Sequence, residues 1–173
     1  MSEAGDAIVR DAIDGLLPVL KRLHRRIRSE VVAACRERAS DELARVAAET
    51  GGDTIYTIDK VSEMLILKEL GREARTLGGL VIIAEGFDGG LTLPLGSSPE
   101  RARFRLLMDP IDGTRGLMYQ KRSAWVLTGV APNRGDGTRL SDIALAVQTE
   151  IPLVKQYLAD ELSAVRGGGV HGE

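Results

Sequence analysis

The sequence has little of what several classes of protein require. A single cysteine, Cys35, stands among 173 residues, which excludes a disulfide framework and favours a reducing compartment. Aromatic residues make up 3% and the formal net charge is −2. The sequence therefore has few aromatic side chains on which bases could stack and no excess of positive charge, which argues against a nucleic-acid polymer as partner. No apolar run reaches the roughly 18–20 residues that span a bilayer, and the first residues lack a signal-peptide core. These absences predict a cytoplasmic protein with neither a membrane nor a nucleic-acid partner.

What is present predicts a single domain over residues 1–173 whose helices precede its strands. Residues 4–50 have helical periodicity, with an expected kink or break at Pro18 and an expected end at Gly51 and Gly52. Residues 60–71 predict another helix, with Val61, Met64, Leu65 and 67–68 around its buried side. β-Branched or apolar runs predict strands over 54–59, 78–86, 104–109, 123–132 and 141–152, and more strand and turn over 153–172.

The order of these elements indicates an α+β fold, since the helices and strands do not alternate regularly. The chain closes on a strand and a glycine-rich turn, "AVRGGGVHGE", which would leave an exposed strand edge. We therefore expect the 173 residues to be the front part of a longer protein.

The stretch "MDPIDGT", residues 108–114, contains more polar groups than a turn needs. Pro110 favours an extended conformation for Asp109 and donates no hydrogen bond itself. A turn at this point can bring the carboxylates of Asp109 and Asp112 and the carbonyl of Ile111 to one side. Two carboxylates and a carbonyl are oxygen ligands of the kind that a divalent cation such as Mg²⁺ prefers.

The next two residues suggest a place for an anion. Gly113 has no Cβ, so a ligand can approach the backbone, and Thr114 is expected to cap a short helix whose first N–H groups would face a phosphate. Asp59 and Glu85 each end a predicted strand as well. Several acids gathered at strand ends would repel one another unless a cation lay between them.

Other interpretations of the motif are a plain turn, a different phosphatase motif and a zinc site. Asp-Pro and Asp-Gly are common in turns, so the motif alone is also compatible with a plain loop. The D-x-x-D-G-T spacing differs by one residue from the D-x-D-G-T of haloacid dehalogenase phosphatases, and that motif opens its domain. His24 and His171 are isolated in the sequence, so no zinc ligand set is present.

"DPIDGT", together with "IIAEG" and "TIYTIDKVSEMLI", resembles the inositol monophosphatase family. That family lies within the fructose-1,6-bisphosphatase superfamily of magnesium-dependent, lithium-sensitive phosphatases. The resemblance implies a layered α/β sandwich in which N-terminal helices pack on a mostly antiparallel sheet, with the C-terminal half missing here. It also implies a cytoplasmic hydrolase that acts on a small phosphate ester and forms a homodimer in its full-length form.

The resemblance implies a role for each residue of the motif. Glu85 would be a carboxylate ligand of a first Mg²⁺ and would help to orient the attacking water. Asp109 would bridge two metals, the Ile111 carbonyl would bind the first metal, and Asp112 would bind the second.

The remaining implied roles concern substrate and water. Gly113 and Thr114 would offer backbone N–H groups to the phosphate, and the Thr114 hydroxyl with Asp59 would position the water. The implied reaction is hydrolysis of an inositol- or sugar-phosphate-type monoester by a metal-activated water. A bisphosphate nucleotidase, a fructose-1,6-bisphosphatase and a non-catalytic, metal-binding fragment are the alternatives.

The sequence also departs from the family's pattern. Gly86 stands where the family has a second acid after the ligand Glu, and Trp125 is followed by Val126 rather than by the Asp of a further metal-binding segment. We therefore expect the 173-residue chain alone to hydrolyse phosphate esters very weakly or not at all.

Overall fold

The computed structural model describes residues 3–37, 51–87 and 89–173, with side chains in the two long helices described for residues 13, 15–36 and from 60 on. The elements, in chain order, are α1 (Glu3–Glu37), α3 (Gly51–Glu73), β1 (Leu80–Ala84), β2 (Leu91–Leu93), the 3₁₀ turn η1 (Pro99–Arg101), β3 (Phe104–Asp112), α4 (Thr114–Met118), β4 (Ala124–Pro132), the 3₁₀ turn η2 (Leu140–Asp142), β5 (Leu145–Ile151), β6 (Glu161–Val165) and β7 (Gly169–Gly172). No helix in the described part is both long enough and apolar enough to cross a membrane.

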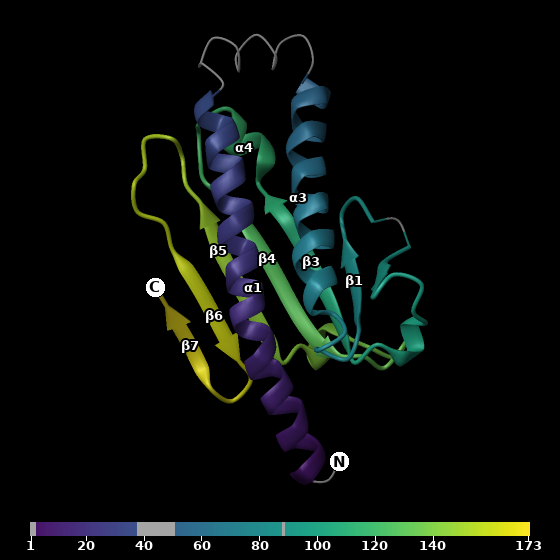
Figure 1. The fold of residues 1–173 in the computed structure, drawn as a ribbon. Helices are drawn as coiled ribbons and strands as arrows, with labels where there is room; N and C mark the ends of the chain where they lie inside the picture. The colour runs from purple at the N-terminus through teal and green to yellow at the C-terminus, as the bar shows by residue number, and fades with distance from the viewer. Residues whose placement is uncertain (1–2, 38–50, 88) are drawn as a thin grey trace.

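The strands form one sheet in the order β2-β1-β3-β4-β5-β6-β7. Among the strands of the described residues, only β1 and β3 pair in parallel, and the other neighbouring pairs are antiparallel. The long helices α1 and α3 lie side by side across one face of this sheet (Figure 1). The predicted α+β class, with N-terminal helices on a mostly antiparallel sheet, is confirmed.

The core lies between the helices and the sheet. Along α1 the buried side chains recur every three or four residues at Leu16, Leu20, Leu23, Ile27 and Val31, which places them on one face of the helix. The sheet meets this stripe with the alternate side chains of its strands, because successive residues of a strand point to opposite faces. On the opposite face, Ile83 and Leu107 remain 41% and 46% exposed.

Several expectations about the helical segments are wrong. Pro18 lies inside α1, which runs from Glu3 to Glu37 without a break, and the proline side chain is exposed. Residues 54–59 are helical rather than a strand, and Gly51 and Gly52 begin α3 instead of ending a helix. Met64, expected on the buried side of this helix, is 61% exposed.

A buried histidine joins α1 to the centre of the sheet. His24 has no exposed surface. Its Nε2 lies 2.7 Å from Oγ1 of Thr128 in β4, and its Nδ1 lies 3.1 Å from Oγ1 of Thr149 in β5. Burial lowers the pKa of His24 from 6.5 to about 3, so the ring is neutral at pH 7. Both ring nitrogens have a partner, and this residue has a structural role.

A second polar contact ties α1 to the edge of the sheet. The carboxylate of Glu161, 3% exposed, accepts two hydrogen bonds from the Arg25 guanidinium, at 2.9 Å and 2.8 Å. The ammonium of Lys21 lies 3.4 Å from the same carboxylate. Two parallel bonds between a guanidinium and a carboxylate fix both position and angle, so this pair sets how α1 lies over β6.

We expect Glu161→Gln to lower the free energy of unfolding by about 1–3 kcal/mol, because a charge-assisted pair in a buried position is lost. Urea denaturation at pH 7 measures the change. Glu173→Gln is the matched control, since Glu173 pairs with Lys21 and Arg25 while 56% exposed, and exposed pairs contribute about 0–1 kcal/mol. Equal losses in the two variants would contradict this account of Glu161.

Candidate active site

Two of the predicted acids lie at neighbouring positions on one edge of the sheet. The parallel pairing of β1 with β3 ends at Ala84 opposite Met108. Glu85 follows Ala84 and Asp109 follows Met108, so both acids stand one residue past the last parallel pair, on strands about 4.8 Å apart. The structure therefore brings Glu85 and Asp109 together at the carboxyl ends of β1 and β3, the end of the sheet near α4 in Figure 1.

A local irregularity of β3 adds Asp112 to the same edge. Asp109 pairs with Leu127 of β4, whereas Asp112 pairs with Trp125. Three steps along β3 thus match two steps along β4, which is a bulge with one extra residue. Inside the bulge, the Ile111 N–H donates to Oδ1 of Asp109 at 3.1 Å. Asp109 is half-buried and Asp112 is exposed.

The turn after Asp112 differs in one respect from the prediction. Gly113, with φ of +94°, is the cap of α4, and Thr114 is the first residue of that helix rather than its cap. Glycine is required at this point because other residues rarely adopt such a φ. The Thr114 hydroxyl donates to the Ile111 carbonyl at 2.8 Å. The carbonyl that is predicted to bind the metal therefore accepts a hydrogen bond within the turn.

The three acids influence one another electrostatically. Burial raises the pKa of the Asp109 carboxyl above its usual value, the hydrogen bond from Ile111 lowers it in part, and the charges of Asp112 and Glu85 raise it further. Even so, in the part of the chain that the structure describes, no three His, Cys, Asp or Glu side chains are arranged to hold a metal ion. Like charges repel, and the side chains are close enough to interact without converging on one point.

The oxygen atoms at this edge fit Mg²⁺ by their chemistry. The available donors are the carboxylates of Glu85, Asp109 and Asp112 and the carbonyl of Ile111, and Mg²⁺ takes oxygen ligands. Their roles as ligands stay a prediction. The side chain of Asp59 lies outside the described residues, so its pairing with Thr114 stays a prediction as well.

Glu63 is an acid near this edge that the sequence reasoning missed. A Cβ placed on Gly86, the residue after Glu85, would collide with Oε1 of Glu63 and stand 2.9 Å from its Cδ. Glu63 also forms an ion pair with Lys60 at 2.7 Å. Glu63 follows Asp59 by four residues, and this spacing puts two residues on one face of a helix. Because residues 54–59 were predicted to form a strand, this helical spacing of the two acids was not recognised.

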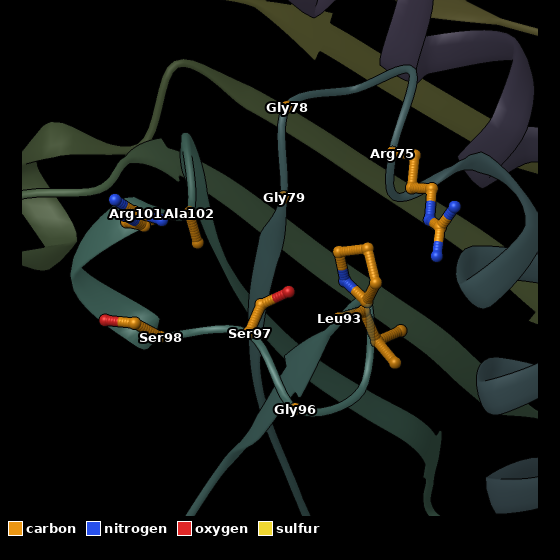
Figure 2. Close-up of a pocket in the computed structure, with 10 residues that line it drawn as sticks. Arg75, Gly78, Gly79, Leu93, Gly96, Ser97, Ser98, Arg101 and Ala102 are labelled. Atoms are coloured by element: carbon orange, nitrogen blue, oxygen red, sulfur yellow. The ribbon is translucent and has the colours of Figure 1, made fainter.

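A cavity of about 620 Å³ lies at the other end of the same strands. Gly78 and Gly79, which precede β1, and Ala102, which precedes β3, line it together with Ser97 and the two arginines Arg75 and Arg101 (Figure 2). None of the predicted site residues lies there. The candidate site therefore lies at the edge of the sheet near α4, and the cavity is a separate feature.

No protein-family model matches the sequence, and no curated protein matches it either. Solved structures do match the fold. Fructose-1,6-bisphosphatase from Leishmania major is 16% identical, with a TM-score of 0.63 over 91% of this chain and 46% of that chain. Inositol monophosphatase II from Staphylococcus aureus is 14% identical, with a TM-score of 0.59 over 91% and 48%. SuhB from Mycobacterium tuberculosis is 19% identical, with a TM-score of 0.51 over 88% and 46%.

The chain thus has the fold of the inositol monophosphatase and fructose-1,6-bisphosphatase structures, and the resemblance seen in "DPIDGT" is confirmed at the level of the fold. It spans about half the length of each of these solved proteins.

Proposed function

We propose that this protein is a Mg²⁺-dependent phosphomonoesterase that acts on an inositol- or sugar-phosphate-type substrate. One observation carries the proposal. Three acids, Glu85, Asp109 and Asp112, stand at the carboxyl ends of two adjacent strands, directly beside a glycine turn that begins a helix. The shared fold with phosphatases supports it.

In this proposal Glu85, Asp109, Asp112 and the carbonyl of Ile111 hold the metal. When bound, Mg²⁺ neutralises negative charge and lowers the pKa of its water. The chain's own residues keep the geometry. The bulge and the Ile111 N–H bond orient the Asp109 carboxylate, while Gly113 leaves the backbone open to a phosphate.

The Thr114 hydroxyl has one proton and in this structure donates it to the Ile111 carbonyl. It cannot donate to Asp59 at the same time. The proposed pair of Thr114 and Asp59 therefore requires the hydroxyl to turn away from Ile111, which would also free a lone pair of that carbonyl. Thr114 would thus link the carbonyl ligand to the positioning of water.

Binding and turnover test the proposal. Isothermal titration calorimetry should show Mg²⁺ binding by the chain, and inorganic phosphate should bind more tightly once Mg²⁺ is present. A panel of inositol, fructose and nucleotide phosphates, followed by phosphate release, then identifies the substrate. A chain that binds neither Mg²⁺ nor phosphate would overturn the proposal.

In a form of the protein that hydrolyses phosphate esters, we expect Thr114→Ala to keep Mg²⁺ binding within a few-fold while phosphate release falls by about 10²–10⁴-fold, the range for a lost proton-transfer group. The reason is that the backbone N–H groups and the acids remain in place. Calorimetry and a phosphate-release assay on the same preparation separate the two effects, and Thr138→Ala, in the hairpin between β4 and η2, is the control. Unchanged turnover in Thr114→Ala would show that this hydroxyl has no part in the chemistry.

A further inference from the structure

The cavity at the start of β1 and β3 is lined by two arginines that the fold leaves without a partner. Arg75 follows α3, Arg101 ends the turn η1, and both line the cavity of about 620 Å³. Within the described residues, neither side chain forms an ion pair or a hydrogen bond. None of the described residues that line the cavity is acidic. The cavity wall therefore carries positive charge in a protein whose formal net charge is −2.

Hydrogen bonds hold the wall of this cavity in place. The N–H of Arg103 donates to the carbonyl of Gly79 at 3.0 Å, which ties the start of β3 to the start of β1. The side-chain amide of Asn133 donates to the carbonyls of Pro99 and Ala102 at 2.7 Å and 2.8 Å. A Cβ on Gly79 would stand 3.0 Å from Cα of Ala102, so the backbones are in close contact. The cavity is thus formed before any ligand enters, which lowers the entropic cost of binding.

The other lining residues indicate which chemistry the cavity suits. The hydroxyl of Ser97 has no partner within the described residues, whereas the hydroxyl of Ser98 donates to Glu100. In the view of Figure 2, Ser97 lies between the two arginines. Leu93 and Ala102 add buried apolar surface. Guanidinium and hydroxyl groups are hydrogen-bond donors of the kind that a phosphate group accepts.

We propose that this cavity is a binding site for a small phosphate ester, separate from the candidate active site. Its volume lies within the roughly 300–1,000 Å³ of small-molecule pockets. None of its described lining residues is aromatic, so it has no surface on which a nucleotide base would stack. The ligand is therefore the phosphate ester of a short polyol or a sugar. Arginine suits this ligand because its planar fork binds phosphate through two parallel hydrogen bonds. The site uses no metal and does not depend on the proposed function.

Binding in EDTA tests the site on the intact chain. Without Mg²⁺, the three acids of the candidate active site repel a phosphate because like charges repel, so a phosphate ester that binds under these conditions binds elsewhere. Titration with glycerol 3-phosphate, followed by NMR, should shift the amide resonances of Gly79 and Gly96, which line the cavity. The amide resonance of Gly113, beside the acids, should stay in place. Glycerol, which lacks the phosphate, should shift none of these resonances at the same concentration.

Variants of the cavity make the result specific. Arg75→Gln and Arg101→Gln should each weaken the binding of glycerol 3-phosphate about tenfold or more, the size of one lost charge-assisted contact. Both arginines are exposed, so the melting temperature should change little. Ser97→Ala should weaken binding by a smaller factor, because it removes an uncharged donor. Arg115→Gln is the matched control, since Arg115 is an exposed arginine of α4, near the candidate active site, and this variant should bind as the wild type does.

The outcomes separate this inference from the proposed function. Unshifted resonances of Gly79 and Gly96 in EDTA, or undiminished binding in both Arg75→Gln and Arg101→Gln, would overturn the site. An equal loss in Arg115→Gln would overturn it as well, because the anion would then respond to the overall charge of the protein. Glycerate that binds as tightly as glycerol 3-phosphate would overturn the assignment to a phosphate ester. Absence of Mg²⁺ binding would instead count against the proposed function and leave this site unaffected.

Discussion

Asp109→Asn is expected to reduce the affinity of the chain for Mg²⁺ by about 10²-fold or more, because it removes a carboxylate from an oxygen ligand set. Asparagine has nearly the same shape, and its Oδ1 can still accept the hydrogen bond from the Ile111 N–H, which Asp109 receives at 3.1 Å. The bulge should therefore persist. Calorimetric titration with MgCl₂ measures the loss, and phosphate release should fall with it.

The same substitution should have the opposite effect on stability when Mg²⁺ is removed. Asp112 and Glu85 both act on the half-buried Asp109 as like charges, so the neutral amide removes a repulsion from the folded protein. In EDTA the variant should melt at a higher temperature than the wild type, whereas added Mg²⁺ should raise only the wild-type melting temperature.

Asp136→Asn is the matched control, since Asp136 is fully exposed in the connection after β4 and lies 3.9 Å from Arg105. It should bind Mg²⁺ as the wild type does. If Asp109→Asn bound Mg²⁺ with wild-type affinity, Asp109 would not be a metal ligand, and the acids at this edge would need another explanation.

The strands near the site followed from the sequence, because apolar runs bounded by turn residues leave few alternatives. Residues 80–84 and 124–132 are strands as predicted. The segment 54–59 is helical rather than a strand for a physical reason. Its threonine and isoleucine residues favour a strand locally. The segment nevertheless belongs to the same helix as Ile66 and Leu70, whose side chains lie in the hydrophobic core. Tertiary packing of the whole helix α3 outweighs the local preference.

Local signals in the sequence pointed to this edge of the sheet, namely the motif at residues 109–114 and the acid Glu85 directly after the strand 80–84. Residues 109–114 lie within a single strand end and turn, so Asp109 and Asp112 could be placed from their spacing. Glu63 approaches from α3, 23 residues before Gly86, and its carboxylate lies against that glycine only because α3 packs on the sheet beside β3. Such a contact depends on the packing of distant elements and leaves no local signal in the sequence.

His24 leads to an expected loss of stability in mild acid. The neutral ring is buried between Thr128 and Thr149, and burial lowers its pKa from 6.5 to about 3. As the pH falls below 6.5, the unfolded chain binds a proton at this residue and the folded chain does not. The unfolded state then binds more protons, so the free energy of unfolding decreases as the pH falls.

The size of the effect follows from the window between the two pKa values. Stability from this group is fully present above pH 6.5 and is lost progressively toward pH 3. One pH unit within the window corresponds to about 1.4 kcal/mol, so wild-type protein should lose about 2 kcal/mol between pH 7.5 and pH 5. Urea denaturation at pH 7.5 and at pH 5 measures the change in the free energy of unfolding. Both values lie above the pH range where Asp and Glu residues usually titrate.

His24→Gln provides the comparison, because an amide can hydrogen-bond to threonine hydroxyls but does not titrate. The variant should be less stable than the wild type at pH 7.5, since its shape differs from that of the ring, yet it should lose much less between pH 7.5 and pH 5. The imidazole resonances of His24 in wild-type protein should also stay constant by NMR over that range. A variant that loses as much stability as the wild type, or a ring that titrates near pH 6.5, would show that the acid sensitivity of this fold arises elsewhere.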